Sequence, residues 1–503
     1  MKNIPFFTVL LSTSAVFRTS PPDDPFDPRR FNFNLFDPIT ETGFDEFASK
    51  VDVYDRTWTL SRVASTYHIS HLGRSLFPSR YDVSAGNSRT RDDMKGFSCL
   101  KLLCGEPTTD KLDANMKLAC LAVRLGLDFK TAEWEDRVVE RTQVERHMRI
   151  YLSVAADFCS LTTVAASEPL LAETASFGMT APGWNAAAAL LSHTHSSRLD
   201  PGDRGEVIAA LILLLARDRA SNAICLDLVP KVGLDDDGFL MHRVITVPEF
   251  LAALLKINVL DDMPARYAKT QVDDRDRPLR DTFQEGYIWF NHYVKIHDLN
   301  VLSEEYLVRL IVRGAAAICA NNQRGADIII PVLFGTTLHP DSVSAIIVQV
   351  KNDASFSTSL KEYLFKAMDP FQLGVFSDTS KNQSKAKPII RMVFALASSK
   401  SGILRPSSEP VPDDFTAYDI WCAGASHKTF VPIYPQETAA YDSLLARLRN
   451  PTEAYQPKGS TDTDVGRARA EARRKQHPAT GTSIHHFQNY VKLVESGEDK
   501  GDA

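Results

Sequence analysis

Apolar residues in the first half of the chain recur every three or four positions, which is the period of an amphipathic helix. The pattern predicts helices at 135–158, 204–217 and Val247–Leu254. The second of these is apolar on all sides, as is typical of a buried helix. No chemical motif occurs in this part of the chain, and packing alone explains its pattern. We therefore interpret 89–270 as a helical domain.

From about residue 279 the pattern alternates between helix and strand. We predict helices at 279–294, 303–312 and 357–368, and strands at 315–320, 326–334, 343–351 and 389–397. Ser303 is expected to cap the second helix. The order around the strands is α-β-β-β-α-β. The predicted fold class is therefore α+β, with a helical N-terminal region followed by this core at 271–440.

The two ends of the chain differ from the rest. Prolines are dense between residues 18 and 48, so we interpret 1–88 as an irregular N-terminal segment. Residues 441–503 are polar and are expected to be a largely disordered tail. The first 17 residues resemble a weak signal peptide that Ser12 and Ser14 interrupt. Secretion is thus the alternative to an intracellular protein of the nucleus or cytoplasm.

Composition, charge and missing motifs argue against several classes of function. The net charge is −6, so bulk charge does not attract nucleic acid and a local basic patch would be needed. The longest apolar run is Val207–Ala216, about half of the roughly 20 residues that a membrane span needs, so no membrane partner is expected. Seven cysteines without a CxxC pair fit reduced thiols in an intracellular compartment. The motifs of P-loop NTPases, serine hydrolases and zinc proteases are absent from the sequence.

Polar residues stand at the ends of two predicted strands. Asp327 opens the strand at 326–334, and Gln349 and Lys351 project from one face of the strand at 343–351, because side chains alternate. If these strands pair, the three polar groups converge on an otherwise apolar sheet. Burying such groups without partners costs about 1–3 kcal/mol each, so a metal ion or a substrate would explain them. The alternative is that each is solvated at a strand end.

The segment ADIIIPVLFGTTLHPDSVSAIIVQVKND resembles the core of the PD-(D/E)xK nuclease superfamily, the restriction-endonuclease-like fold. The resemblance implies that Asp327 is a metal ligand, that Gln349 occupies the acidic position and that Lys351 positions the attacking water. Two departures are that Gln349 offers an amide oxygen in place of a carboxylate, and that Ala326 replaces the proline. The wider stretch 200–435 resembles uncharacterised transposon-associated and Crinkler-associated proteins of mushroom-forming fungi, on phrases such as RGAAAICANNQRGADIIIPV and YDIWCAGASHKTF.

The implied cofactor is Mg²⁺ or Mn²⁺. A hard cation prefers oxygen ligands, and one carboxylate with one amide is a small set. A further carboxylate is therefore expected from a preceding helix, with Glu305 as the candidate metal ligand and solvation of Glu305 as the alternative. The implied reaction is metal-assisted hydrolysis of a phosphodiester bond.

The expected partner is nucleic acid, with DNA favoured over RNA. Residues 361–391 hold six basic and three acidic side chains, a local net charge of +3. Lys381, Lys385 and Lys387 are the candidate nucleic-acid contacts, and an ordinary solvated loop is the alternative.

Two functional hypotheses follow. The first is a metal-dependent nuclease that uses the D…QxK site. The second is a catalytically inactive nuclease-fold scaffold that acts as an interaction or nucleic-acid-binding protein. In the first, Asp327, Gln349, Lys351 and a helical glutamate should lie together.

Overall fold

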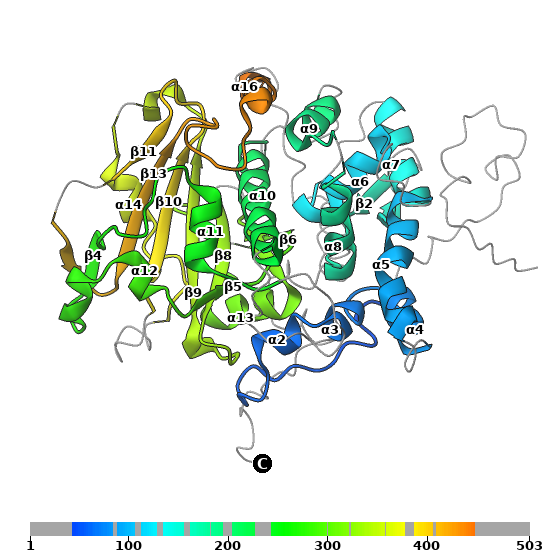
Figure 1. Cartoon of the computed structure of the whole chain (residues 1–503), viewed down its shortest axis with the longest axis horizontal. Helices are drawn as coiled ribbons and strands as arrows, with labels where there is room; N and C mark the ends of the chain where they lie inside the picture. Colours follow the sequence, from blue (N-terminus) through cyan, green and yellow to red (C-terminus); the bar gives the residue numbers. More distant parts are fainter. Residues whose placement is uncertain are drawn as a thin grey trace, which may run out of the picture.

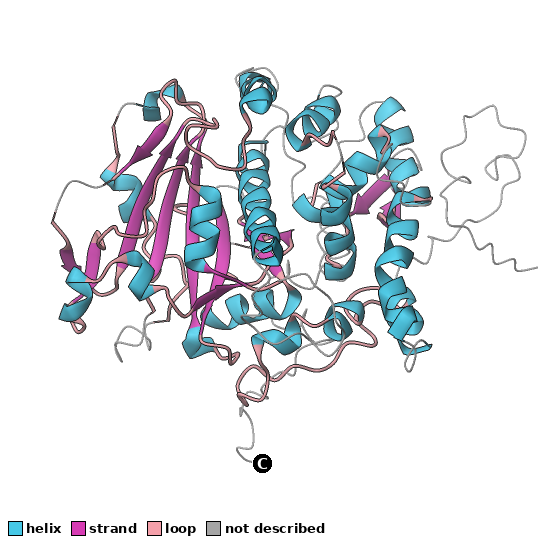
Figure 2. Ribbon diagram, viewed as in Figure 1, coloured by secondary structure: helices cyan, strands magenta, loops and turns pink. Residues whose placement is uncertain are grey.

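The structure is a computed structural model in which helices gather on one side and a large sheet on the other (Figures 1 and 2). It describes residues 43–83, 88–105, 112–127, 134–154, 161–181, 183–194, 204–226, 243–298, 300–320, 323–357, 359–377, 387–405 and 409–447. The α+β class is confirmed, with helices dominating the N-terminal half and strands the C-terminal half. No helix in these ranges is long and apolar enough to cross a membrane.

The α-helices have the following bounds. They are α2 Leu60–Val63, α3 Thr66–Ser70, α4 Leu76–Val83, α5 Ser88–Leu103, α6 Ala114–Leu125, α7 Trp134–Arg146, α8 Pro169–Gly178, α9 Ala186–Thr194, α10 Arg204–Leu226, α11 Val247–Leu254, α12 Leu279–Thr282, α13 Glu304–Arg313, α14 Glu362–Ala367 and α16 Thr438–Arg447. The long helix α10 stands between the sheet and the helices of the N-terminal half, and packs against α6, α11 and β9 (Val343–Lys351) (Figure 1).

The strands belong to one small and one large sheet. The small antiparallel pair is β1 Ile150–Val154 and β2 Leu161–Val164. The large sheet holds β3 Ile245–Thr246, β4 Arg266–Ala268, β5 Gly286–Ile288, β6 His292–Lys295, β7 Ala315–Ile318, β8 Ile328–Phe334, β9, β10 Ile389–Ala395, β11 Gly402–Leu404, β12 Val411–Asp413 and β13 Ala417–Ala423. Its main path runs β12-β4-β13-β10-β9-β8-β5-β3, with β7 beside β8 and β6 beside β7.

The predicted α-β-β-β-α-β order is present as α13, β7, β8, β9, α14 and β10. Strand β8 is antiparallel to both β7 and β9, whereas β10 is parallel to β9. Ser303 caps α13 as expected, because its side chain accepts a hydrogen bond from the N–H of Tyr306. Strands β7, β9, β10 and β13 therefore end at the same edge of the sheet, where β8 begins.

Two predicted helices are wrong. The helix expected at 135–158 ends at Arg146, and Met148 then adopts a φ of 62°, a left-handed conformation that reverses the chain before β1. The helix expected at 279–294 stops after Thr282 and gives way to β5 and β6. Ile288, Trp289 and Phe290 are fully buried, and a buried run of this kind lacks the alternation that identifies a strand.

Other parts of the chain also differ from expectation. The segment interpreted as irregular, 1–88, contains α2, α3 and α4, and the predicted tail begins with most of α16. The proline-rich stretch up to residue 42, the signal-like start and residues 448–503 lie outside the described ranges. Strand β13, which pairs with β10 along its whole length, was not predicted.

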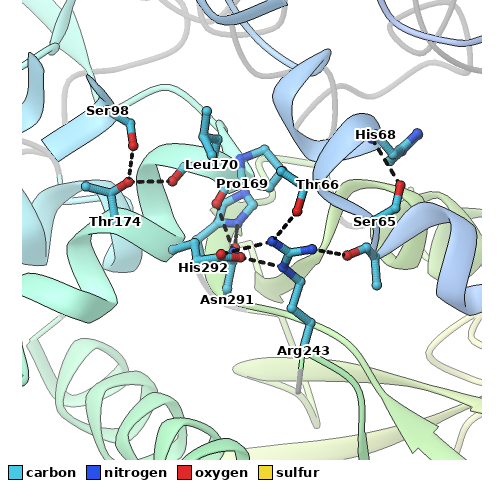
Figure 3. A network of polar contacts seen from close by, with 12 residues as sticks. Ser65, Thr66, His68, Ser98, Pro169, Leu170, Thr174, Arg243, Asn291 and His292 are labelled. Carbon is cyan, nitrogen blue, oxygen red and sulfur yellow. Dashed lines mark hydrogen bonds and ion pairs between the residues drawn. The ribbon is translucent and has the colours of Figure 1, made fainter. Parts of the chain in front are cut away.

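Buried ion pairs join the helical half to the sheet. Arg243 precedes β3 and donates to both carboxylate oxygens of Glu173 on α8, at 2.6 and 3.0 Å. It also donates to the carbonyl of Ala64 and the hydroxyl of Thr66, between α2 and α3 (Figure 3). Arg313, at the end of α13, donates to Asp45 at 2.6 Å, and both side chains are fully buried. The helices and the sheet therefore share one interior.

Candidate active site

The polar residues of the D…QxK motif lie in one row across the sheet. The antiparallel ladder of β8 and β9 ends at the pair of Ile328 and Val348, and the residues that follow, Asp327 on one strand and Gln349 on the other, lie on the opposite face from that pair. The N–H of Asp327 donates to the carbonyl of Val348 at 2.9 Å. Lys351 follows on the same face as Gln349 because side chains alternate along a strand. On the other side, the N–H of Cys319 donates to the carbonyl of Asp327 at 2.8 Å, which puts Cys319 in the same row.

Asp327 is held by the backbone of the neighbouring strand. Its carboxylate accepts a hydrogen bond from the N–H of Val350 at 2.6 Å. Burial raises the pKa of Asp327 above its usual range, and this effect exceeds the lowering by the Val350 N–H and by the positive charge of Lys351. The positive charge of Lys351 therefore stabilises the Asp327 carboxylate, but by less than burial destabilises it.

Gln349 is the least satisfied member of the row. Gln349 is only 6% exposed, and its Oε1 atom has no hydrogen-bond partner among the residues that the structure describes. An unpaired buried acceptor costs about 1–3 kcal/mol. An amide oxygen beside a carboxylate offers the oxygen ligands that a hard divalent cation prefers.

Glu305, the expected third ligand, is engaged elsewhere. It forms an ion pair with Arg309, four residues further along α13, and its carboxylate also contacts Tyr54. The spacing of four residues places the two charged groups on the same side of the helix. The structure therefore brings together Asp327, Gln349 and Lys351, and uses Glu305 to hold the N-terminal segment.

Glu206 and Asn352 approach the row and were missed in the sequence. The first turn of α10 packs against the end of β9 so closely that a Cβ atom on Gly205 would lie 1.7 Å from the Asn352 amide nitrogen. The Oδ1 atom of Asn352 is buried, and no described residue forms a hydrogen bond with it. No sequence signal identifies these residues, because α10 precedes the core by about a hundred residues.

The pKa of the Cys319 thiol depends on the charges at this end of the sheet. Burial raises the pKa of its thiol well above the usual range, and the carboxylates of Asp327 and Glu206 raise it further. Both carboxylates are therefore near Cys319, and the thiol stays protonated. Within the described ranges no three His, Cys, Asp or Glu side chains are grouped to hold a metal ion, so a cation here would depend on amide oxygens as well.

The candidate nucleic-acid contacts lie apart from this row. Lys387 precedes β10, whose Ile390 and Ala395 pair with Ile346 and Lys351, so Lys387 is at the opposite end of the sheet. At about 3.3 Å per residue the separation from Lys351 is roughly 25 Å. Lys381 and Lys385 fall outside the described residues.

A buried Ser–His–Asn chain is a second polar cluster. Ser167 Oγ lies 2.7 Å from His292 Nε2, and His292 Nδ1 lies 2.8 Å from Asn291 Oδ1. The three residues are at most 1% exposed, and Ser167 also accepts from Arg313. The hydroxyl is buried from solvent, so the cluster stabilises the junction of the helices and the sheet.

Part of the chain matches the model of a known family. No curated protein and no solved structure matches the chain significantly. Residues 244–402, about a third of the chain, match the model of a family described as a domain of unknown function, DUF8736. The matched segment includes Asp327, Gln349 and Lys351 and excludes both Glu206 and β13. This part of the chain is thus similar to the DUF8736 family.

Proposed function

We propose that the protein is a divalent-metal-dependent nuclease that hydrolyses phosphodiester bonds of DNA at Asp327, Gln349 and Lys351. The observation that carries the proposal is the row of Asp327 and Gln349, with an unpaired buried amide oxygen next to a carboxylate. The resemblance to the PD-(D/E)xK superfamily in the same residues gives the reaction type.

In this proposal Asp327 and Gln349 hold the cation through oxygen atoms, with Glu206 at the start of α10 as the further carboxylate. Bound Mg²⁺ or Mn²⁺ supplies a water of lowered pKa and neutralises charge on the phosphate. Lys351 stabilises the negative charge that develops on the phosphoryl oxygens. The attacking water would lose a proton to solvent as its oxygen bonds to phosphorus, the ester P–O bond would break, and the leaving oxygen would take up a proton from water.

The second candidate is an inactive nuclease-fold scaffold that binds nucleic acid or another protein. Two observations favour it: an amide stands at the acidic position, and Glu305 is committed to Arg309. The two candidates differ in whether Asp327 is needed for chemistry or only for the fold.

Cleavage assays distinguish the nuclease from the inactive scaffold. Purified full-length protein is incubated with plasmid, linear and single-stranded DNA in Mg²⁺, Mn²⁺ or EDTA. We expect metal-dependent cleavage that Asp327→Ala and Lys351→Ala reduce at least a hundredfold, while Lys428→Ala, an exposed lysine on another loop, leaves it unchanged. No cleavage by a correctly folded wild type in either metal would reject the nuclease and favour the scaffold.

A further inference from the structure

A polar cavity of about 750 Å³ lies at the end of the sheet away from Asp327. Its wall includes Phe334 at the end of β8, Lys387 before β10, and residues around α12. Seven residue steps along β8 separate Asp327 from Phe334, or roughly 20 Å. The cavity is therefore a site of its own, with a volume in the range of small-molecule pockets.

The wall near α12 is fixed by hydrogen bonds to the sheet. The hydroxyl of Tyr418 on β13 donates to the carbonyl of Arg277 and lies 2.7 Å from the hydroxyl of Thr282. The N–H of Gly335 donates to the carbonyl of Glu285 at 2.9 Å. The backbone that carries the polar side chains is thus anchored before any ligand binds, which lowers the entropy cost of binding.

Four charged side chains of the wall are available to a ligand. Arg277 donates only a long hydrogen bond, 3.3 Å, to the carbonyl of Asp281, and the ammonium of Lys387 lies 5.8 Å from the Phe334 ring centroid. The carboxylates of Asp281 and Glu285 form no ion pair with any residue that the structure describes. The other two acidic groups of the wall already have partners, since Asp274 accepts from Thr416 and Asp341 pairs with Arg56.

We propose that this cavity binds a ribonucleotide. Arg277 and Lys387 provide two cations for the phosphate, and guanidinium groups bind phosphate oxygens in pairs. Phe334 offers an aromatic ring on which a base can stack. Asp281 and Glu285 accept hydrogen bonds from the ribose hydroxyls, as acidic residues do in dinucleotide sites. The phosphate supplies the negative charge that the two cations require, the ribose hydroxyls supply hydrogen-bond donors for the two carboxylates, and a free amino acid is too small for the volume.

Calorimetric titration of the full-length protein with AMP tests the proposal, in EDTA so that metal at Asp327 plays no part. We expect saturable one-site binding that Arg277→Ala and Lys387→Ala each weaken at least tenfold. Arg280→Ala is the matched control, because Arg280 lies three residues after Arg277, on α12, but pairs with Asp261. Adenosine should bind at least tenfold more weakly than AMP, and dAMP several-fold more weakly. Asp327→Ala should bind AMP like the wild type, so the result is independent of the proposed nuclease.

Three results would overturn the proposal. They are the absence of saturable AMP binding by the wild type, equal affinity for inorganic phosphate or for free phenylalanine, and binding that neither Arg277→Ala nor Lys387→Ala weakens. Thermal unfolding of each variant shows whether it is folded. Because Lys387 lies in an irregular segment, Lys387→Ala remains informative even if Arg277→Ala fails to fold.

Discussion

We expect the ionised carboxylate of Asp327 to lower the free energy of unfolding while it provides a ligand for a cation. Its pKa is raised in the folded protein, so the folded state binds a proton more tightly than the unfolded state does. The free energy of unfolding therefore falls as the pH rises from the ordinary aspartate pKa through the folded value, and the ionised group is a cost at neutral pH.

Asp327→Asn should consequently raise the free energy of unfolding at pH 7, by up to about 1 kcal/mol. An asparagine oxygen can still accept the hydrogen bond from Val350, so the geometry is retained. Urea unfolding at pH 7 and pH 4 measures the effect, and the gain should shrink at the lower pH. A variant that is less stable than the wild type at pH 7 would contradict this account of the site.

Gln349→Glu tests the unpaired amide oxygen. A buried carboxylate without a cation is costly, so the melting temperature in EDTA should fall by several degrees. Mg²⁺ or Mn²⁺ should then raise it more than in the wild type, because a carboxylate binds a hard cation better than an amide does. Gln349→Leu is the control of similar size and should not respond to metal. An equal metal response of all three proteins would argue against a cation site at Gln349.

At this scale the sequence suffices for residues that share a strand or adjacent strands. The alternation along 343–351 places Gln349 and Lys351 on one face, and the short connection to Asp327 favours pairing of the two strands. The same reasoning does not reach Glu206, because its place depends on how a distant helix packs. It also fails for Glu305, which pairs with Arg309 four residues further along the same helix.

At the scale of helices and strands, the turn before β8 fixes the position of Asp327. Gly325 has a φ of 88°, and a Cβ atom added there would lie 1.9 Å from the carbonyl oxygen of Ala367, at the end of α14. The glycine lets the end of α14 lie directly against the turn before β8. Gly335, after β8, has a similar φ of 77° but nothing within 4 Å of an added Cβ atom.

Gly325→Ala should therefore cost more than Gly335→Ala. The positive φ alone costs about 1 kcal/mol in each variant. The clash with Ala367 should add at least about 2 kcal/mol to the loss for Gly325→Ala and should weaken metal binding by displacing Asp327. Chemical denaturation of both variants provides the comparison. Equal losses would mean that α14 does not constrain the turn.

Helices and strands could be predicted where the hydrophobic pattern of the sequence fits only one of the two. Strands β7, β8 and β9 are apolar runs separated by glycine and proline, and α11 has a capping box at Thr246 and Glu249. The predicted helix at 279–294 failed because β5 and β6 are short and largely buried, and length and periodicity then favour a helix. Strand β13 lies beyond the motif and is not among the strands that the pattern predicts.

For the whole molecule, Arg243 is the main test of how the helical half and the sheet depend on each other. It is 5% exposed, and it donates to Glu173 on α8 and to the backbone between α2 and α3 (Figure 3). Arg243→Ala would leave Glu173 buried without its cation, which costs about 3–5 kcal/mol. The exposed pair of Arg280 and Asp261 is the control, and Arg280→Ala should cost less than about 1 kcal/mol.

A single cooperative unfolding transition that shifts as a whole in Arg243→Ala would indicate that both halves unfold together. Two separate transitions, of which only one shifts, would show that the halves are independent. These contacts cross the boundary between the helical domain and the core that the sequence suggests. The hydrophobic pattern of a helix does not show which neighbouring element its buried charges will contact.

The most direct test of the central claim is Mn²⁺ binding, followed by electron paramagnetic resonance without any substrate. The wild type should bind about one Mn²⁺ per chain, with the affinity falling as the pH is lowered and Asp327 becomes protonated. Asp327→Ala should lose this binding, and Lys351→Ala should keep it, because the lysine is proposed to act on phosphate. Binding that survives in Asp327→Ala, or no binding by the folded wild type, would contradict a metal site at the Asp327–Gln349 row.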